Sequence, residues 1–442
     1  MTSSSPRVLV RVDAGMGIGI GHLARCLSMV SDLVGRGVRV TIATRASGEP
    51  FESRILASGA QIWKLSVAPD SERADGPVWS DEAQLADARA TVRAPGGPWD
   101  AVVVDHYHLD QSWECEVAKA ASRMVVIDDL ANRKHVADVL VDHNWYGPKT
   151  LDRYSTLVPE HALTLIGPRY AMLQAEYRGL TSSRRTVAHP PRRVLVSFGG
   201  TDVSGQTVRA LAALVRFPEF AVDIVIGARR AVTPQLVDLV EANDHFTLHV
   251  EKPSLAPMLA NSDLVIGAGG TATWERLCVG VPAIVTTVSE NQSGVTRAFH
   301  EAGITNWLGT SEEVSIEDYE TAIREFVEHP PEPVPAIVDG FGAARVALAV
   351  IPRHAFAATS RLATASDTAA YVTAGTAAMS GRDVPAIWRG REQEFSRGIE
   401  NGPAIEIVEV GGVPVGVVQS GAVSMAVLDP YVVYSNEERQ NT

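Results

Sequence analysis

Short apolar runs alternate along most of the chain with longer amphipathic stretches. Continuous apolar strands separated by helices are typical of parallel sheets that are covered on both faces. In the first half, the predicted strands are 7–12, 38–44, 101–105, 124–128 and 139–141, and the predicted helices are 22–36 and about 113–122. In the second half, the predicted strands are 193–196, 222–226, 246–250, 264–267 and 283–287, and the predicted helices are 204–216, 233–242, 255–260 and 272–279. The pattern predicts an α/β protein.

The two halves begin alike. Arg-Val-Leu-Val occurs at 7–10 and again at 193–196, each time as a strand that leads into a glycine-rich turn. We therefore expect two tandem Rossmann-like domains, covering 1–180 and 193–350, joined by a linker at 181–192 that is rich in Ser, Arg and Pro. Ligands of such domains bind beyond the carboxyl ends of the strands, so two facing domains would enclose one cleft.

The turn after the first strand brings a histidine to the start of a helix. Every second residue from Gly15 to Gly21 is a glycine, which lets backbone N–H groups and the positive helix end approach an anion. His22 comes next, and an imidazole is a common general base. An incidental histidine in a glycine-rich connection explains the turn equally well. The turn also fits a dinucleotide motif ending at Ala24, but the second strand ends in Arg45 where that motif requires an acid.

A second run of small residues that suits anion binding follows the predicted strand 264–267. The run from Gly267 to Thr273 combines glycines with threonines at a helix start, which suits a diphosphate without a metal. Glu275, one turn into that helix, is placed either to accept hydrogen bonds from ribose hydroxyls or simply to favour the helix start by its charge. Other polar groups at strand ends are Asp13, Asp105-His106-Tyr107, Gly199-Gly200-Thr201-Asp202 and Ser289-Glu290-Asn291-Gln292.

Two pairs of residues at strand ends have side chains that bind metals. They are His106-x-His108 and Asp128-Asp129. No third ligand follows at a characteristic spacing, and a polar loop or a helix cap explains both pairs as well. We therefore expect no metal and no cofactor. The sequence also lacks the motifs of P-loop ATPases, zinc proteases and α/β-hydrolases.

The composition is that of a soluble globular protein, with 45% hydrophobic and 21% charged residues in 442. A net charge of −13 and the lack of any Lys and Arg cluster argue against nucleic-acid binding. Three scattered cysteines make no disulfide framework, and no run of about 18 apolar residues would cross a membrane. We expect a cytoplasmic protein without a membrane anchor, and the oligomeric state stays open.

Several segments, taken together and in order over about 7–350, resemble the UDP-sugar hydrolase family of pseudaminic acid biosynthesis. These segments are Ile-Gly-Ile-Gly-His-Leu-Ala-Arg-Cys-Leu (18–27), Val-Asp-His-Tyr-His-Leu-Asp (104–110), Val-Ile-Asp-Asp-Leu-Ala-Asn-Arg (126–133), Gly-Pro-Arg-Tyr-Ala-Met-Leu (167–173), Val-Ser-Phe-Gly-Gly-Thr-Asp (196–202), Gly-Ala-Gly-Gly-Thr-Ala-Thr-Trp-Glu-Arg (267–276), Glu-Asn-Gln (290–292) and Asp-Gly-Phe-Gly-Ala-Ala-Arg-Val (339–346). Each segment is short, but the combination is specific.

The resemblance implies a GT-B-like arrangement, in which the second domain mainly holds UDP and the first holds the sugar. His22 is the catalytic residue by this resemblance, and Tyr107 and Asn291 line the sugar site. Asp13 joins the catalytic candidates because it is near His22 in sequence and could orient the imidazole or bind a sugar hydroxyl. The implied UDP contacts are Gly199, Gly200, Gly269, Gly270, Thr271 and Glu275, and the implied substrate contacts are Gly21, Arg25 and Gln292.

The implied reaction is hydrolysis of a UDP-amino-sugar at its anomeric carbon, with His22 as the base that accepts a proton from the attacking water. A UDP-sugar-dependent glycosyltransferase with a small acceptor would use the same fold and the same base. A protein that only binds a nucleotide sugar is a third, non-enzymatic alternative.

The pattern changes beyond residue 350. A predicted helix at 367–379 and a hairpin at 405–419, which turns at Gly411-Gly412, indicate a small α+β unit over 360–442. The segments that resemble the front part of a GNAT acetyltransferase are 361–367, 405–418 and 423–430. The coenzyme A loop of that family, (Q/R)-x-x-G-x-(G/A), does not follow them. We expect an incomplete unit without acetyl-CoA activity, and an unrelated appendage is the alternative.

Overall fold

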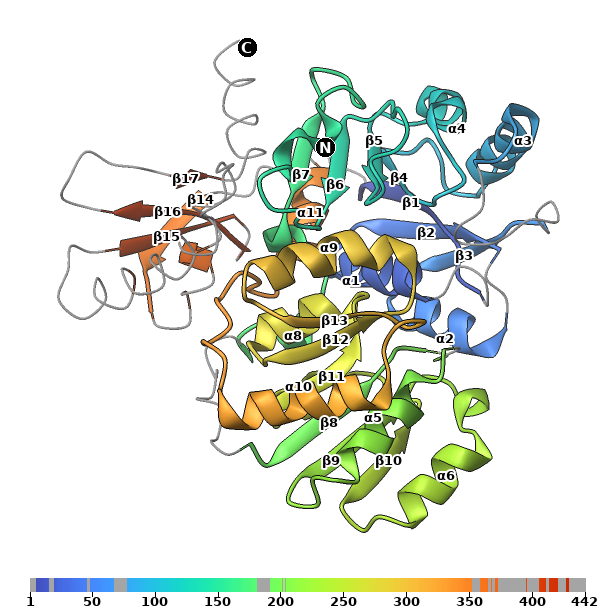
Figure 1. Ribbon diagram of the computed structural model, residues 1–442. Coiled ribbons are helices and arrows are strands. Elements are labelled where there is room, and N and C mark those ends of the chain that lie inside the picture. Colours follow the sequence, from blue (N-terminus) through green and yellow to red (C-terminus); the bar gives the residue numbers. More distant parts are fainter. Residues whose placement is uncertain are drawn as a thin grey trace.

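The computed structural model describes residues 5–15, 20–45, 48–66, 78–180, 191–200, 202, 204–351, 358–364, 367, 370–372, 395, 405–410, 413–419 and 427–428. These residues form two parallel sheets and one antiparallel sheet (Figure 1). The prediction of two α/β domains followed by a small third unit is confirmed. In this part of the chain, every helix is too short or too polar to cross a membrane.

A seven-stranded parallel sheet in the order β3-β2-β1-β4-β5-β6-β7 forms the centre of the first domain. Its strands are β1 (Arg7–Val12), β2 (Arg39–Thr44), β3 (Gln61–Lys64), β4 (Ala101–Asp105), β5 (Met124–Ile127), β6 (Val139–Asp142) and β7 (Leu163–Ile166). Its helices are α1 (Gly21–Gly35), α2 (Glu49–Ala57), α3 (Asp81–Val92) and α4 (Gln111–Val117). The sequence pattern did not predict β3, β7, α2 or α3. The two strands have only four residues each, and α3 is largely polar, so their apolar signal is weak.

The second domain is built on a six-stranded parallel sheet in the order β10-β9-β8-β11-β12-β13. Its strands are β8 (Arg193–Ser197), β9 (Ala221–Ile226), β10 (Phe246–Val250), β11 (Leu264–Ala268), β12 (Ala283–Thr287) and β13 (Asn306–Thr310). Its helices are α5 (Gln206–Leu214), α6 (Pro234–Glu241), α7 (Ala256–Leu259), α8 (Ala272–Val279), α9 (Glu290–Glu301) and α10 (Ile316–Glu328). In both domains the strands that precede the predicted site loops are where the sequence pattern placed them.

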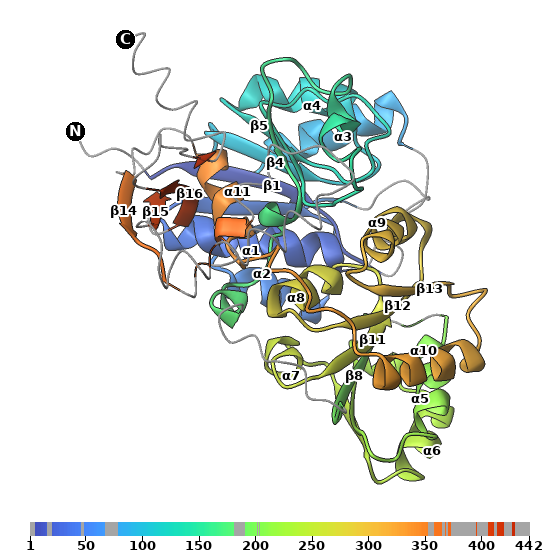
Figure 2. The same cartoon turned by 60° about the vertical axis from the view of Figure 1, so that its left-hand side comes forward.

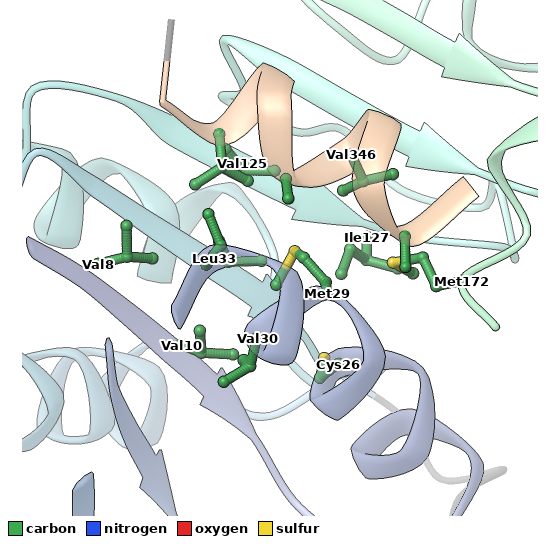
Figure 3. Close-up of a cluster of buried hydrophobic side chains, with 14 of the residues drawn as sticks. Val8, Val10, Cys26, Met29, Val30, Leu33, Val125, Ile127, Met172 and Val346 are labelled. Atoms are coloured by element: carbon green, nitrogen blue, oxygen red, sulfur yellow. The ribbon is translucent and has the colours of Figure 1, made fainter. Parts of the chain in front are cut away.

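Side chains of the first sheet alternate between two cores. Val8, Val10 and Val12 of β1 pack on the face that carries α1, together with Met29 and Leu33 of that helix (Figure 3). The residues between them face the other way, because successive strand side chains point to opposite faces. Leu9, for example, packs with the core on the far face. This alternation also decides which polar residues at the strand ends can reach α1.

The helix α11 (Gly342–Val350) packs in the first domain, although the sequence-based boundary assigned 193–350 to the second. Val346 lies in the same core as Met29 of α1 and Met172 (Figure 3). All nine residues of α11 are buried, so the helix is covered on every side. An added Cβ at Gly342 would lie 2.2 Å from the carbonyl oxygen of Ala171, so a glycine is required for this close approach.

The third unit is an antiparallel sheet that rests on α11 (Figure 2). Its strands are β14 (Ala358–Leu362), β15 (Ile405–Val410), β16 (Val413–Gln419) and β17 (Val427–Leu428). The pairing of β15 with β16 confirms the predicted hairpin, whose turn lies outside the described residues. Val413 and Val415 pack against Ala344 and Leu348 of α11. Most of the predicted helix 367–379 also lies outside the described residues, and 370–372 within it are helical.

Candidate active site

The first turn of α1 presents His22 to the end of β4. The Nδ1 atom of His22 lies 2.5 Å from Oδ1 of Asp105, the last residue of that strand. Both residues are buried, with 7% of His22 and 1% of Asp105 exposed. A carboxylate that accepts the Nδ1 proton fixes the orientation of the ring and leaves Nε2 as the basic nitrogen.

Arg25, one turn further along α1, holds the same carboxylate. Its Nε and one Nη atom donate to the two oxygens of Asp105 at 2.7 Å each, and its other Nη donates to Asp129 at 2.7 Å. Burial by itself would raise the pKa of Asp105, but the charges of Arg25 and His22 lower it well below its ordinary value. Asp105 therefore stays ionised beside the imidazole. Arg25, expected to contact the substrate, is engaged with two carboxylates of the protein.

Asp13 does not contact His22, so the expectation that it orients the imidazole is wrong. Asp13 instead accepts hydrogen bonds from Arg11 at 2.8 Å, from His106 at 3.1 Å and from the backbone N–H of Arg45 at 2.6 Å. Burial favours the neutral acid, but the charge of Arg11 and the hydrogen bond from His106 lower the pKa of Asp13 well below its ordinary value. Only 1% of Asp13 is exposed.

Strand alternation explains why Asp105 contacts His22 and Asp13 does not. Val12 packs toward α1, so Asp13, one residue later, points to the opposite face. The pairing of β1 with β4 places Asp105 level with Val12, and therefore on the α1 face. The sequence pattern marks Asp105 as a polar residue at a strand end but does not pair it with His22. The face on which Asp105 lies is indicated by Val103, two positions earlier, which is an apolar residue of the α1-facing core.

Tyr107 and Asn291 meet where the two domains face each other. The ring of Tyr107 stands edge-on to His22, with 4.4 Å between the ring centroids. The Nδ2 group of Asn291, in the first turn of α9, donates to the Tyr107 hydroxyl at 3.4 Å. Burial, and then the charge of Asp129, raise the pKa of Tyr107 well above its ordinary value, so it remains a neutral phenol. Tyr107 therefore lies beside the imidazole, and Asn291 contacts Tyr107 from the second domain.

Three helices begin near this point without a side-chain cap. In none of α1, α8 and α9 does the N-cap side chain accept a hydrogen bond from a backbone N–H of the first turn. The starts of α1 and α8 approach closely, since a Cβ added to Gly21 would lie 3.0 Å from Oγ1 of Thr271. Uncapped helix starts leave backbone N–H groups free to bind an anion.

The glycines of the 267–271 loop allow close packing around this helix start. An added Cβ at Gly269 would lie 2.4 Å from Oγ1 of Thr296, and one at Gly270 would lie 3.4 Å from Nε2 of Gln292. Gln292 also accepts a hydrogen bond from the backbone N–H of Val288 at 3.1 Å. The loop is thus held against α9 with its backbone close to neighbouring side chains.

Glu275 lies in α8 next to the buried phenol of Tyr177. Burial is the main cause that raises the pKa of Glu275 to about 7, while the Tyr177 hydroxyl opposes the shift. The next residue, Arg276, donates to the carbonyl oxygen of Ala268 at 2.9 Å and to Oγ1 of Thr273 at 2.9 Å. These bonds tie the 267–271 loop to the helix that carries Glu275.

Gly199 and Gly200 follow β8 at the same edge of the second sheet. Gly199 has a φ of +86°, in the region that favours glycine. Gly227 lets the neighbouring loop approach, because a Cβ there would lie 2.6 Å from Cα of Gly200. Asp202 accepts hydrogen bonds from the N–H groups of Gln206 and Thr207, at 3.0 and 2.9 Å, and so fills the start of α5 with its own carboxylate.

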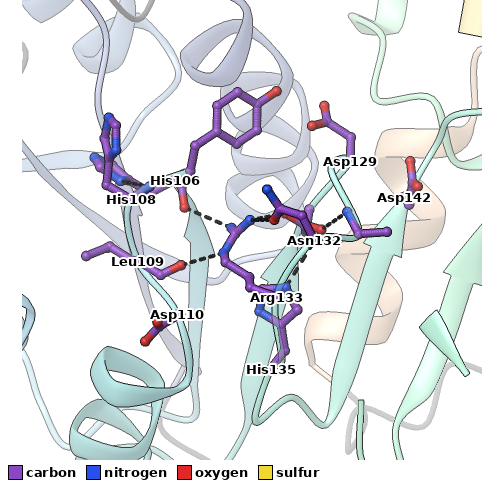
Figure 4. A network of polar contacts seen from close by, with 12 residues as sticks. His106, His108, Leu109, Asp110, Asp129, Asn132, Arg133, His135 and Asp142 are labelled. Atoms are coloured by element: carbon purple, nitrogen blue, oxygen red, sulfur yellow. Dashed lines mark hydrogen bonds and ion pairs between the residues drawn. The ribbon is translucent and has the colours of Figure 1, made fainter. Parts of the chain in front are cut away.

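The residues that resembled metal ligands belong to packed polar networks. His108 stacks on Trp79 and His106 stands edge-on to it. Asp128 pairs at 2.8 Å with Arg133, which lies near His106 and His108 in Figure 4. Asp129 accepts from Arg25, on the α1 face. Among the residues that the structure describes, no three His, Cys, Asp or Glu side chains are grouped so that they could hold a metal ion.

Solved structures share this arrangement of two parallel-sheet domains. The two domains have the GT-B fold. MurG of Acinetobacter baumannii matches with a TM-score of 0.52 and 12% identity, over 78% of this chain and 99% of that one. LpCGTa in complex with UDP matches with a TM-score of 0.53 and 13% identity, over 89% and 100%. UGT89C1 of Arabidopsis thaliana, complexed with UDP, matches with a TM-score of 0.50 and 12% identity, over 78% and 100%.

Two curated proteins are similar to this chain in sequence. The uncharacterized protein MJ1062 of Methanocaldococcus jannaschii is 20% identical over 293 residues, which are 65% of this chain and 56% of that protein. The spore coat polysaccharide biosynthesis protein SpsG of Bacillus subtilis is 25% identical over 149 residues, 33% of this chain and 44% of that protein. The chain thus spans about half the length of each relative. No protein-family model matches it.

Proposed function

We propose that this protein is an enzyme that cleaves the bond between UDP and the anomeric carbon of a UDP-sugar, and that it passes the sugar to an acceptor. The observation that carries the proposal is the His22–Asp105 pair, 2.5 Å apart, at a helix start that abuts the start of α8. The GT-B fold and the UDP complexes among its structural neighbours support UDP as the nucleotide.

His22 acts as the general base. Asp105 accepts its Nδ1 proton, so that Nε2 removes a proton from the attacking hydroxyl or water. The proton moves from the nucleophile to Nε2 while the nucleophile forms a bond to the anomeric carbon. The bond from that carbon to the diphosphate oxygen breaks, and its electron pair leaves with UDP. Asp105 stabilises the imidazolium that results.

The second domain stabilises the leaving diphosphate. The uncapped start of α8 and the backbone N–H groups of Gly269 and Gly270 supply donors for its negative charge. Glu275, one turn along α8, accepts hydrogen bonds from the ribose. Tyr107 and Asn291 contact the sugar between the domains.

Hydrolysis is the second candidate, with water as the acceptor. Two observations favour it. The motifs over about 7–350 resemble a UDP-sugar hydrolase family, and His22 is only 7% exposed, which suits a nucleophile as small as water. The imidazole chemistry is the same in both reactions.

Release of UDP from a panel of UDP-sugars, with and without candidate acceptors, tests the proposal. Transfer requires that UDP release depends on an added acceptor, whereas hydrolysis releases UDP in buffer alone. In water enriched in ¹⁸O, hydrolysis at the anomeric carbon places the label on the sugar and none on UDP. If the protein binds UDP but releases it from no UDP-sugar under either condition, the enzymatic proposal is wrong and a binding function remains.

A further inference from the structure

Three side chains form a row where β4, β5 and β6 end. When the register of these paired strands is continued past the strand ends, positions 107, 129 and 143 are level with one another. Strand alternation places all three on the face of the sheet that carries α1, as it does for Asp105. The row therefore consists of Tyr107, Asp129 and His143.

The contacts of the row agree with this placement. Tyr107 lies against His22, and Asp129 accepts a hydrogen bond from Arg25 at 2.7 Å. The ring of His143 stands edge-on to Trp274 of α8, with 5.2 Å between the centroids. Trp274 directly precedes Glu275 in the chain. The row thus extends from the imidazole to the second domain.

Two polar atoms of the row, Oδ1 of Asp129 and Nδ1 of His143, are buried and make no hydrogen bond of ordinary geometry with the described residues, although the Tyr107 hydroxyl interacts with the Asp129 carboxylate. Other buried polar atoms of the described residues are in the same state, but these two lie on neighbouring strand ends beside the candidate base. Since buried polar atoms usually have a partner, their position there points to a ligand.

The charge states of this pair limit what it can bind. Burial would raise the pKa of Asp129, but the charges of Arg25 and His22 lower it, so Asp129 offers an acceptor. Burial, followed by the charge of Arg25, lowers the pKa of His143 to about 3, so its ring is neutral. A hydroxyl satisfies both atoms, because it donates its proton to the Asp129 carboxylate and accepts a hydrogen bond from the Nδ1–H of the neutral His143 ring.

We propose that Asp129 and His143 bind one hydroxyl of the sugar, and that they thereby select UDP-sugars that carry a hydroxyl at that position. This inference rests on the proposed UDP-sugar function. In it, Asp129 has two roles, since one oxygen holds Arg25 and the other is available to the sugar.

The test compares His143→Leu with His143→Asn in calorimetric titrations of the whole protein with UDP, UDP-glucose and UDP-N-acetylglucosamine. Leucine fills the space but offers no polar atom, whereas the asparagine amide keeps a polar group close to the Nδ1 position. We expect His143→Leu to weaken the better-bound UDP-sugar by about tenfold without changing UDP affinity. His143→Asn should stay within about threefold of the wild type. His108→Leu, a buried histidine on the opposite face, is the matched control and should leave both affinities unchanged.

Two results would overturn the inference. One is equal affinity of the wild type and His143→Leu for both UDP-sugars. The other is a wild type that binds neither UDP-sugar more tightly than UDP. Failure of the wild type to bind UDP at all would instead overturn the proposed function, so the two failures are distinguishable.

Discussion

The two faces of the first sheet carry networks of the same composition, one His, one Arg and two Asp. On the α1 face they are His22, Arg25, Asp105 and Asp129. On the opposite face they are His106, Arg11, Asp13 and Asp87. The two networks nevertheless differ, because the two histidines differ in how many of their ring nitrogens make hydrogen bonds.

The two histidines differ in how many ring nitrogens are engaged. His106 uses both, since Nε2 contacts Asp13 and Nδ1 accepts the N–H of His108 at 3.2 Å. Burial is the main cause that lowers the pKa of His106 to about 4. In His22, only Nδ1 is engaged by described residues, and the ring lies at a helix start that faces the second domain. The same residue types thus leave one ring nitrogen of His22 without a described partner, while both ring nitrogens of His106 are engaged.

The largest expected effect separates the two histidines. His22→Ala removes the proposed base and should lower turnover of a UDP-sugar by roughly 10³-fold while UDP affinity stays unchanged. His106→Ala should lower the free energy of unfolding and leave the turnover of the folded protein within about threefold of the wild type. Steady-state kinetics, calorimetry with UDP and urea unfolding measure the three quantities. Normal turnover by His22→Ala would remove His22 from the mechanism.

The two aspartates that contact these histidines should differ in the same way. Asp105→Asn leaves the imidazole without its carboxylate and should lower kcat by roughly 10²-fold. Asp13→Asn breaks a buried ion pair with Arg11 and should lower the free energy of unfolding by about 3 kcal/mol, with little change in kcat. Kinetics and urea unfolding of both variants provide the comparison. A greater loss of kcat in Asp13→Asn than in Asp105→Asn would reverse our assignment of the two faces.

Two tyrosines, one on each face of the sheet, should show a smaller difference of the same kind. Tyr107→Phe removes the hydroxyl that contacts Asn291 across the domains and should lower kcat/KM by about fivefold. Tyr154→Phe removes a hydroxyl that donates to Asp128 at 3.0 Å on the opposite face of the sheet, and should cost about 1 kcal/mol of stability without changing kcat/KM. Equal kinetic losses in the two variants would show that the faces are not functionally distinct.

The smallest expected effect is a change in how stability depends on pH. Burial raises the pKa of Asp142 on the opposite face from 3.8 to about 7, although Arg153 opposes the shift. The folded state therefore holds this proton up to a higher pH than the unfolded state does. The free energy of unfolding accordingly decreases as pH rises from about 4 to about 7. In Asp142→Asn, the decrease in Tm between about pH 4 and about pH 7 should be smaller than in the wild type by roughly 2–4 °C. An unchanged slope in thermal unfolding would contradict it.

The sequence pattern predicted the architecture and most strands of both sheets, because buried parallel strands such as β1 and β11 are continuous apolar runs. It also selected strand-end residues, including Tyr107 and Asn291, that the structure brings together. It did not identify Asp105 as the partner of His22, because nearness in sequence suggested Asp13. It also could not reveal that α11 returns to the first domain, since local periodicity says which face of a helix is buried but not which neighbour covers it.

Proton and nitrogen NMR of the histidine rings tests the central claim most directly, namely that Asp105 holds the Nδ1 proton of His22. In protein labelled with ¹⁵N-histidine, we predict a strongly deshielded Nδ1 proton for His22, assigned by its loss in His22→Ala. This signal should persist in Asp13→Asn and disappear in Asp105→Asn. An unprotonated Nδ1, or a signal that survives in Asp105→Asn but is lost in Asp13→Asn, would contradict the account.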